Sequence, residues 1–100
     1  MNSLKKVLQD QNSFVRTYAA WALGTMGKDA VPALVQALQD EDTRVPRVAA
    51  EALGEIGSED AVPTLIQVLQ DENVGVRRRV ARVLGRIGTP EALKAVKDFQ

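Results

Sequence analysis

One motif occurs three times in this chain, at intervals of thirty and thirty-one residues. The middle copy, residues 43–57, reads TRVPRVAAEALGEIG, while residues 13–27 read SFVRTYAAWALGTMG and residues 74–88 read VGVRRRVARVLGRIG. Repetition at this period predicts a solenoid, in which each unit buries its apolar face only by stacking on its neighbours. The expected fold class is therefore all-α, with the helices arranged as an α-solenoid.

Each unit begins with a predicted amphipathic helix. Residues 30–39 and 61–70 carry apolar side chains at the spacing i, i+3, i+4, i+7, which gathers them on one side of a helix. Pro32 and Pro63 fall in the first turn, where a helix tolerates the missing N–H. Residues 2–9 are expected to form the corresponding first helix of the chain.

A second helix follows in each unit after a short polar turn. Thr43 is the favoured cap of the middle one, because it leaves Pro46 in the first turn, where proline is tolerated. A glycine inside a helix costs about 1 kcal/mol relative to alanine, so we expect the repeated internal glycine to let neighbouring helices approach closely. Glycine also ends helices in the left-handed conformation. The internal glycines are Gly24, Gly54 and Gly85, and the terminal ones are Gly27, Gly57 and Gly88.

The last part of the chain, residues 89–100, is expected to form a helix capped by Thr89, which brings the predicted count to seven. Arg79 and Lys97 stand where inner units carry apolar residues, and we interpret them as the polar ends of a finished small protein. The expected organisation is a single domain, 1–100, with units 1–27, 28–57 and 58–88 followed by helix 89–100.

Composition limits the chemistry that is expected. The chain has no Cys and no His, which argues against thiol or imidazole catalysis and against a zinc site. Glu51 and Glu55 lie one turn apart, but with Arg47 one turn before them they are interpreted as ordinary surface ion pairs. No phosphate-binding glycine loop and no serine with a base partner is found. We therefore predict no enzyme, no cofactor and no metal site.

Charge and hydropathy favour a soluble cytoplasmic protein. Thirteen basic residues balance thirteen acidic residues, so the net charge gives no reason to expect nucleic acid or an anionic membrane as a partner. No apolar run approaches the roughly 18 residues of a membrane span. The N-terminal stretch also lacks the apolar core of a signal peptide.

The second helices are predicted to present one continuous protein-binding surface. Each keeps a row of exposed residues at i, i+4 and i+8, and the rows change from aromatic to mixed charge to basic. Trp21 is expected to be exposed as an interface anchor, although packing over the first helix stays open as an alternative. Tyr18 is expected to pack between repeats. The rows are Thr17, Trp21 and Thr25, then Arg47, Glu51 and Glu55, then Arg78, Arg82 and Arg86.

The function predicted from these rows is a non-enzymatic scaffold that binds a protein or peptide partner. The basic row of Arg78, Arg82 and Arg86 keeps nucleic-acid binding open as an alternative. The zero net charge and the absence of interleaved aromatic residues argue against that alternative. Weak self-association through the two ends of the stack also stays open.

The pattern VRxxAAxALGxIG followed by AVPxLxxxLxD resembles the HEAT-like repeat of the phycobilisome lyase type, over nearly the whole chain. The resemblance implies a right-handed stack of antiparallel helix pairs, with the first helices on the convex layer. It implies no single activity, but it adds the accessory subunit of a chromophore lyase as an alternative function. Arg16 and Arg77 match a family arginine that braces the turn between repeats by reaching an aspartate. Because Pro46 replaces it in the middle unit, Asp40 is expected to lack its partner.

Overall fold

The structure, a computed structural model, describes residue 7 and residues 10–99. Within these residues the chain is helical, and the predicted all-α solenoid is confirmed. The predicted count of seven helices is not, because six α-helices are described and the expected helix 2–9 lies outside the described residues except for residue 7. The elements are α2 (Ser13–Gly24), η1 (Gly27–Ala30), α3 (Val31–Ala37), α4 (Arg44–Ile56), η2 (Glu59–Ala61), α5 (Val62–Val68), α6 (Val74–Ile87) and α7 (Pro90–Phe99).

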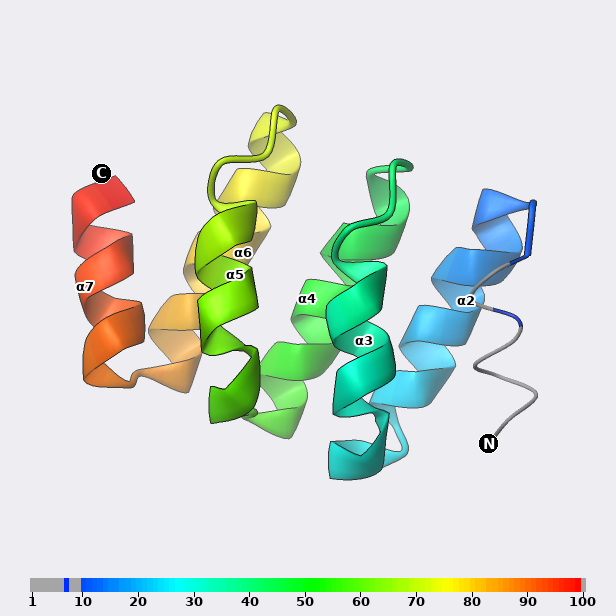
Figure 1. Cartoon of the computed structure of the whole chain (residues 1–100), viewed down its shortest axis with the longest axis horizontal. Helices are drawn as coiled ribbons and strands as arrows, with labels where there is room; N and C mark the ends of the chain where they lie inside the picture. Colours follow the sequence, from blue (N-terminus) through cyan, green and yellow to red (C-terminus); the bar gives the residue numbers. More distant parts are fainter. Residues whose placement is uncertain (1–6, 8–9, 100) are drawn as a thin grey trace.

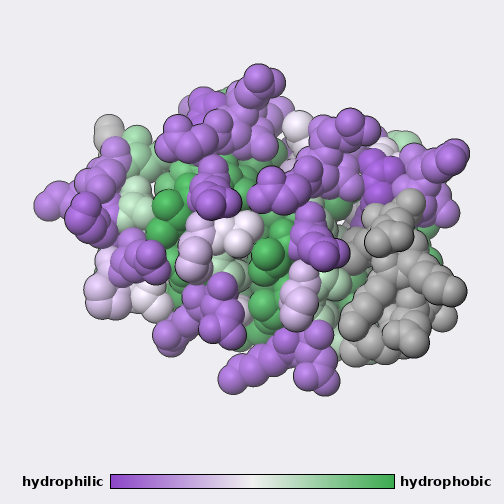
Figure 2. Space-filling model, in the orientation of Figure 1, coloured by the Kyte–Doolittle hydropathy of each residue, from purple (hydrophilic) through white to green (hydrophobic). Residues whose placement is uncertain are grey.

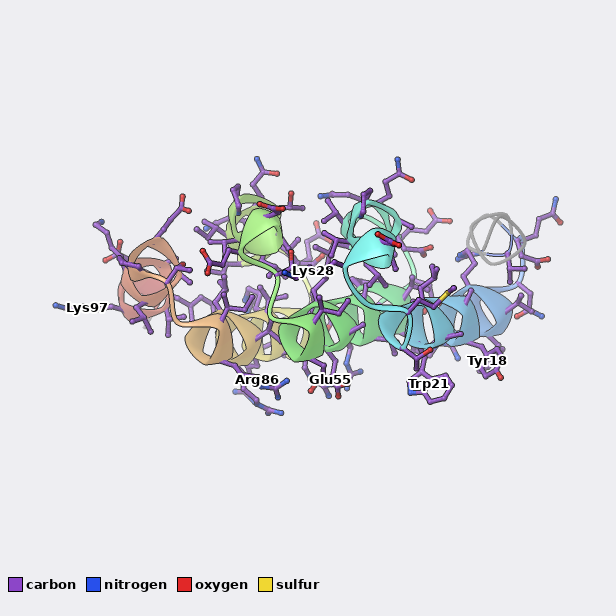
Figure 3. The ribbon with its side chains drawn as sticks, turned by 90° about the horizontal axis from the view of Figure 1, so that it is seen from below. Tyr18, Trp21, Lys28, Glu55, Arg86 and Lys97 are labelled. Carbon is purple, nitrogen blue, oxygen red and sulfur yellow. The ribbon has the colours of Figure 1, made fainter. Side chains whose placement is uncertain are left out.

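The helices form two layers, seen edge-on in Figure 3. The first layer holds α3, α5 and α7, and the second layer holds α2, α4 and α6. Within the second layer each helix packs on the next, α2 on α4 and α4 on α6. The units follow one another along the longest axis, in a molecule of 37 × 26 × 15 Å (Figure 1). This is the stacked arrangement that a repeat of this period requires.

The core lies between the layers and along the seams between successive helices. Figure 2 shows apolar residues in the middle of the α3–α5–α7 face and hydrophilic residues along its upper and lower edges. Leucines from both layers are fully buried, and alanines fill the space where the helices come closest. The buried leucines are Leu23, Leu34, Leu38, Leu53, Leu65 and Leu84.

The helices α3 and α5 are shorter than the segments 30–39 and 61–70 that were predicted. Each is preceded by a turn of 3₁₀-helix and carries its proline in the first turn. At the other end the backbone tightens to i→i−3 hydrogen bonds, as in the bond from the Asp40 N–H to the Ala37 carbonyl at 3.2 Å. Such tightening is common at helix ends and removes the last residues from the α-helix.

The second-layer helices begin with different caps. The Asn12 side chain accepts from the Phe14 N–H at 2.8 Å, and the Asn73 side chain accepts from the Val76 N–H at 3.1 Å. Thr43 occupies the cap position of α4, but its side chain makes no capping hydrogen bond, so the predicted role of its hydroxyl is wrong. The reason is that Thr43 already has helical backbone angles, whereas a capping side chain needs an extended backbone.

Two of the three glycines predicted inside the helices lie where helices almost touch, although Gly24 proves to be the last residue of α2. A Cβ on Gly24 would lie 2.7 Å from the Cβ of Ala52, and one on Gly54 would lie 3.1 Å from Cγ1 of Val83. At Gly85 no atom would lie within 4 Å of the added carbon, because no further helix of this layer follows α6 in the described chain. The glycine therefore permits close packing only where a following helix is present.

Tyr18 in α2 and Arg79 in α6 occupy equivalent positions in their repeats. A side chain at this position faces the preceding helix of the second layer. Nη1 of Arg79 lies 3.3 Å from Oε1 of Glu51 in α4, so the interpretation of Arg79 as a polar end residue is wrong. In the described residues α2 has no preceding helix in its layer. Tyr18 is consequently 65% exposed, and the prediction that it packs between repeats is wrong as well.

No helix in the described part of the chain is both long enough and apolar enough to cross a membrane.

Substituting alanine for single glycines tests the packing between layer neighbours. Gly24→Ala should lower the free energy of unfolding by about 1–3 kcal/mol, because the new methyl group overlaps Ala52 and forces the helices apart. Gly85→Ala is the matched control and should raise it by up to about 1 kcal/mol, since only helix propensity changes there. Urea denaturation followed by circular dichroism measures both. A Gly24→Ala protein as stable as the original would contradict the close approach.

Candidate protein-binding surface

The outer side of the α2–α4–α6 layer carries side chains from all three helices. Figure 3 shows Tyr18, Trp21, Glu55 and Arg86 projecting from this layer, away from α3, α5 and α7. The stacking of the units therefore brings residues of three separate repeats onto one side of the molecule. We call this side the second-layer surface.

An aromatic stripe occupies the α2 part of this surface, formed by Phe14, Tyr18 and Trp21 at the spacing i, i+4, i+7. Their exposed fractions are 66%, 65% and 58%. The rings of Tyr18 and Trp21 stack with centroids 5.9 Å apart and planes inclined by 21°. With this exposure Trp21 is not packed down as the alternative proposed. Phe14 was missed because the repeats were aligned for their buried positions, and its counterpart in α4 is Arg44.

Arg44 holds the edge of the aromatic stripe in place. Its guanidinium carbon lies 4.1 Å from the centroid of the Phe14 ring, a cation–π contact. Nη2 also donates to Oγ of Ser13 and to Oδ2 of Asp42, both at 2.9 Å. The Arg44 side chain is the main reason that the pKa of Asp42 lies well below its usual range, and the Arg44 N–H and the Ser13 hydroxyl lower it further. One arginine thus joins the beginnings of α2 and α4.

Thr17 and Thr25, the other two residues predicted for the α2 row, are less available for contact with a partner. Thr17 is half-buried, and its hydroxyl donates to the Ser13 carbonyl at 2.7 Å. The Thr25 hydroxyl donates in the same way to the Ala22 carbonyl at 2.7 Å, although Thr25 itself is exposed. Hydroxyls of serine and threonine often bond to their own helix in this way. The aromatic side chains therefore provide most of the contact area of α2.

The α4 row is linked to α6 instead of forming pairs within its own helix. Glu51 is half-buried and accepts from Arg79 at 3.3 Å and from Arg86 at 3.1 Å. The expected pairing of Glu51 and Glu55 with Arg47 is absent among the described residues. The guanidinium of Arg47 extends toward Gly75 at the start of α6, and Glu55 stays exposed. Glu51 therefore holds α4 and α6 together.

The basic row on α6 keeps two arginines free for other contacts. Arg86 is engaged by Glu51, whereas Arg78 and Arg82 are exposed and form no ion pair within the described residues. The second-layer surface consequently runs from exposed aromatic rings on α2, across a cross-linked centre on α4, to free positive charge on α6. Aromatic anchors beside arginines are typical of protein interfaces.

The arginines predicted to brace the turns lie at the edge where each first-layer helix meets the second-layer helix that follows. Nε and Nη2 of Arg16 bind the carboxylate of Asp40 at 2.7 and 3.1 Å. The expectation that Asp40 lacks its partner is therefore wrong. The brace reaches forward into the next unit, so the replacement at Pro46 affects Asp71 instead.

Known proteins share the sequence pattern and the fold of this chain. The sequence pattern of the family described as HEAT repeats matches residues 1–47 and 31–99. Phycocyanobilin lyase subunit alpha of Microchaete diplosiphon is 42% identical over 62 residues, which cover 52% of this chain and 21% of that protein.

Solved structures give the same result. A chain in the complex of CpcE and CpcF of phycocyanin lyase from Nostoc sp. PCC7120 matches with a TM-score of 0.82 and 35% identity, over 92% of this chain and 38% of that one. An engineered protein matches with a TM-score of 0.69 and 27% identity, over 97% of this chain and 49% of that one. The chain thus spans less than half the length of each of these proteins.

These relatives contradict the prediction that the chain is not an enzyme and favour the alternative of a chromophore-lyase subunit. Two of them carry the names of lyases. The prediction was wrong because it required one short chain to contain a complete set of catalytic groups. A subunit of a larger enzyme need not contain such a set, so the absence of His and Cys removes particular chemistries but not enzymatic function.

Fluorescence of the single tryptophan tests the exposure of the aromatic stripe. Trp21 should emit nearly as free tryptophan does and be quenched efficiently by acrylamide, because its ring lies in water. Trp21→Ala should change the free energy of unfolding by less than about 0.5 kcal/mol. The nearby Leu23→Ala, at a fully buried position, should lower it by about 2–5 kcal/mol. Blue-shifted, poorly quenched emission would show that the stripe is covered.

Proposed function

This chain belongs to the HEAT-repeat family, with repeats of the phycobilisome lyase type, and from that premise we propose that it acts as one subunit of a bilin lyase complex. The observation that supports this most is the likeness to the chain from the CpcE–CpcF complex, which extends over 92% of this chain.

The proposed role of the second-layer surface is to bind a second lyase-type HEAT-repeat chain. The related structure is a complex of two different subunits, which supports a protein partner. Tyr18 and Trp21 would anchor the partner, since large exposed rings contribute most of the affinity in many interfaces. Arg78 and Arg82 would steer an acidic patch of the partner toward the surface.

The pairing of the basic row makes phosphate binding a weaker explanation. Glu51 pairs with Arg86 of the row and with Arg79 beside it, so the row does not present three free cations to a nucleic-acid backbone. The same pairing leaves positive charge at the edge of the surface. A charged rim around aromatic anchors suits a protein partner better.

A reconstituted attachment reaction tests the proposal. The chain is combined with a lyase-type partner subunit, apo-phycocyanin and phycocyanobilin, and covalently bound chromophore is measured by fluorescence of the denatured protein. The complete mixture should attach chromophore faster than the mixture that lacks this chain. Equal rates would show that the chain is not part of the lyase.

Variants of the second-layer surface test the docking role separately. Trp21→Ala combined with Arg82→Glu should weaken capture of the partner subunit at least about tenfold, because an anchor and a steering charge are both lost. The matched control is Lys94→Glu, a charge reversal at an exposed site of α7 in the other layer. Capture that is unchanged in the double variant, with helical content intact, would show that the partner binds elsewhere.

A further inference from the structure

Arg16 binds two turns of the chain at once. Nη1 donates to the carbonyl oxygens of Asp10 at 2.7 Å and of Gln11 at 3.0 Å, both in the turn that precedes α2. Nε and Nη2 donate to the carboxylate of Asp40 in the next unit. Two carbonyls and one carboxylate thus surround a single guanidinium. This set of acceptors matches the planar fork of donors that only arginine offers.

The first half of this arrangement recurs in the last unit. Nη1 of Arg77 donates to the carbonyls of Asp71 at 2.7 Å and of Glu72 at 3.0 Å, which are equivalent to those of Asp10 and Gln11. The turn before each of these helices therefore folds so that two carbonyls converge on one guanidinium. The geometry belongs to the repeat and is not peculiar to one unit.

The middle unit keeps the acceptors but lacks the donor. Pro46 stands at the position of Arg16, and the equivalent acceptors are the carbonyls of Asp40 and Glu41 and the carboxylate of Asp71. No described residue donates to either carbonyl. The carboxylate of Asp71 accepts only the N–H of Asn73, at 2.8 Å, within the described residues. The acceptor set that holds Arg16 in the preceding unit is here without a cation.

A hollow lies at this place. It has a volume of about 640 Å³ and is lined by the turns 39–43 and 70–73 together with Pro46. Figure 1 shows the two turns next to each other along the upper edge of the molecule. The hollow opens to solvent and is large enough for a side chain to enter from outside.

Arg47, the residue after Pro46, does not supply the missing cation. The guanidinium carbon of Arg47 lies 3.9 Å from where a Cβ on Gly75 would be, which places it against the start of α6. It makes no hydrogen bond to Asp71 among the described residues. The acceptors are therefore open to a cation from another molecule.

We propose that this hollow binds the guanidinium of an arginine that a partner protein supplies. The partner's arginine would take the place that Arg16 occupies in the preceding unit, with a two-point contact to Asp71 and hydrogen bonds to the carbonyls of Asp40 and Glu41. Charge-assisted, two-point contacts of this kind are stronger and more directional than contacts with lysine. The proposal goes beyond the lyase function and does not depend on it.

Titration of the full chain with an arginine analogue tests this site. The probe is N-acetyl-L-arginine methylamide, and amide chemical shifts of the isotope-labelled protein are measured by NMR. Saturable shifts are expected at residues 40–43 and 70–73. The citrulline analogue has nearly the same shape but no charge and should bind more weakly, as should the lysine analogue.

Substitutions within the two turns identify the groups that bind the probe. Asp71→Asn should weaken binding at least about tenfold, while Glu72→Gln removes the same charge from the same turn and should leave binding nearly unchanged. Pro46→Arg should abolish binding, because an internal arginine then fills the hollow, whereas Pro46→Ala should retain it. Circular dichroism confirms that each variant is folded, and Asp71→Asn decides the matter if Pro46→Arg is not.

Three results would overturn the proposal. The first is the absence of saturable shifts in the two turns of the original protein. The second is equal binding by the Asp71→Asn and Glu72→Gln variants, which would show general attraction to acidic surface. The third is equal binding of the arginine and lysine analogues, which would remove the assignment to a guanidinium.

Discussion

The close approach of neighbouring second-layer helices is the constraint on which the rest of this structure depends. Gly24 against Ala52 and Gly54 against Val83 set how near α2, α4 and α6 lie and which side chains meet. A larger residue at either glycine would push the neighbouring helices apart and change the relative orientation of their exposed rows. Because the contact repeats at equivalent positions, the rows on three helices lie side by side on one surface.

Polar contacts between units adjust this arrangement without supplying most of its stability. A fully buried leucine such as Leu53 contributes about 1.5–3 kcal/mol, whereas an exposed ion pair contributes less than about 1 kcal/mol. The contacts of Glu51 with Arg79 and Arg86 are partly exposed and belong to the weaker class. Their effect is directional, since they fix how α4 and α6 are turned relative to each other and which charges remain for a partner.

The repeat in the sequence was enough to predict the solenoid, the order of its helices, and Gly57 and Gly88 as the glycines that end α4 and α6 with positive φ. Gly27 also has a positive φ, but the prediction that it ends a helix is wrong, because α2 already ends at Gly24. Of the two alternatives that the repeat left open for Trp21, the structure supports the exposed side chain. The repeat did not predict which neighbour a given helix position faces, because periodicity defines a side of the helix but not its direction along the stack. Tyr18, Arg79 and Asp40 were misjudged for this one reason. Tyr18 and Arg79 face the preceding unit and not the following one, and Asp40 binds an arginine of the preceding unit and not one of its own unit.

Pro46 shows how one substitution in a repeat can create a potential binding site. Proline at the third position of α4 requires no N–H and fixes a backbone angle that the helix needs, so the exchange costs the helix little. The turns at residues 40–42 and 71–73 keep the hydrogen bond that the turn before α2 also makes, in which the aspartate side chain accepts the N–H two residues later. The acceptors around the missing arginine are therefore held in position by the units on either side.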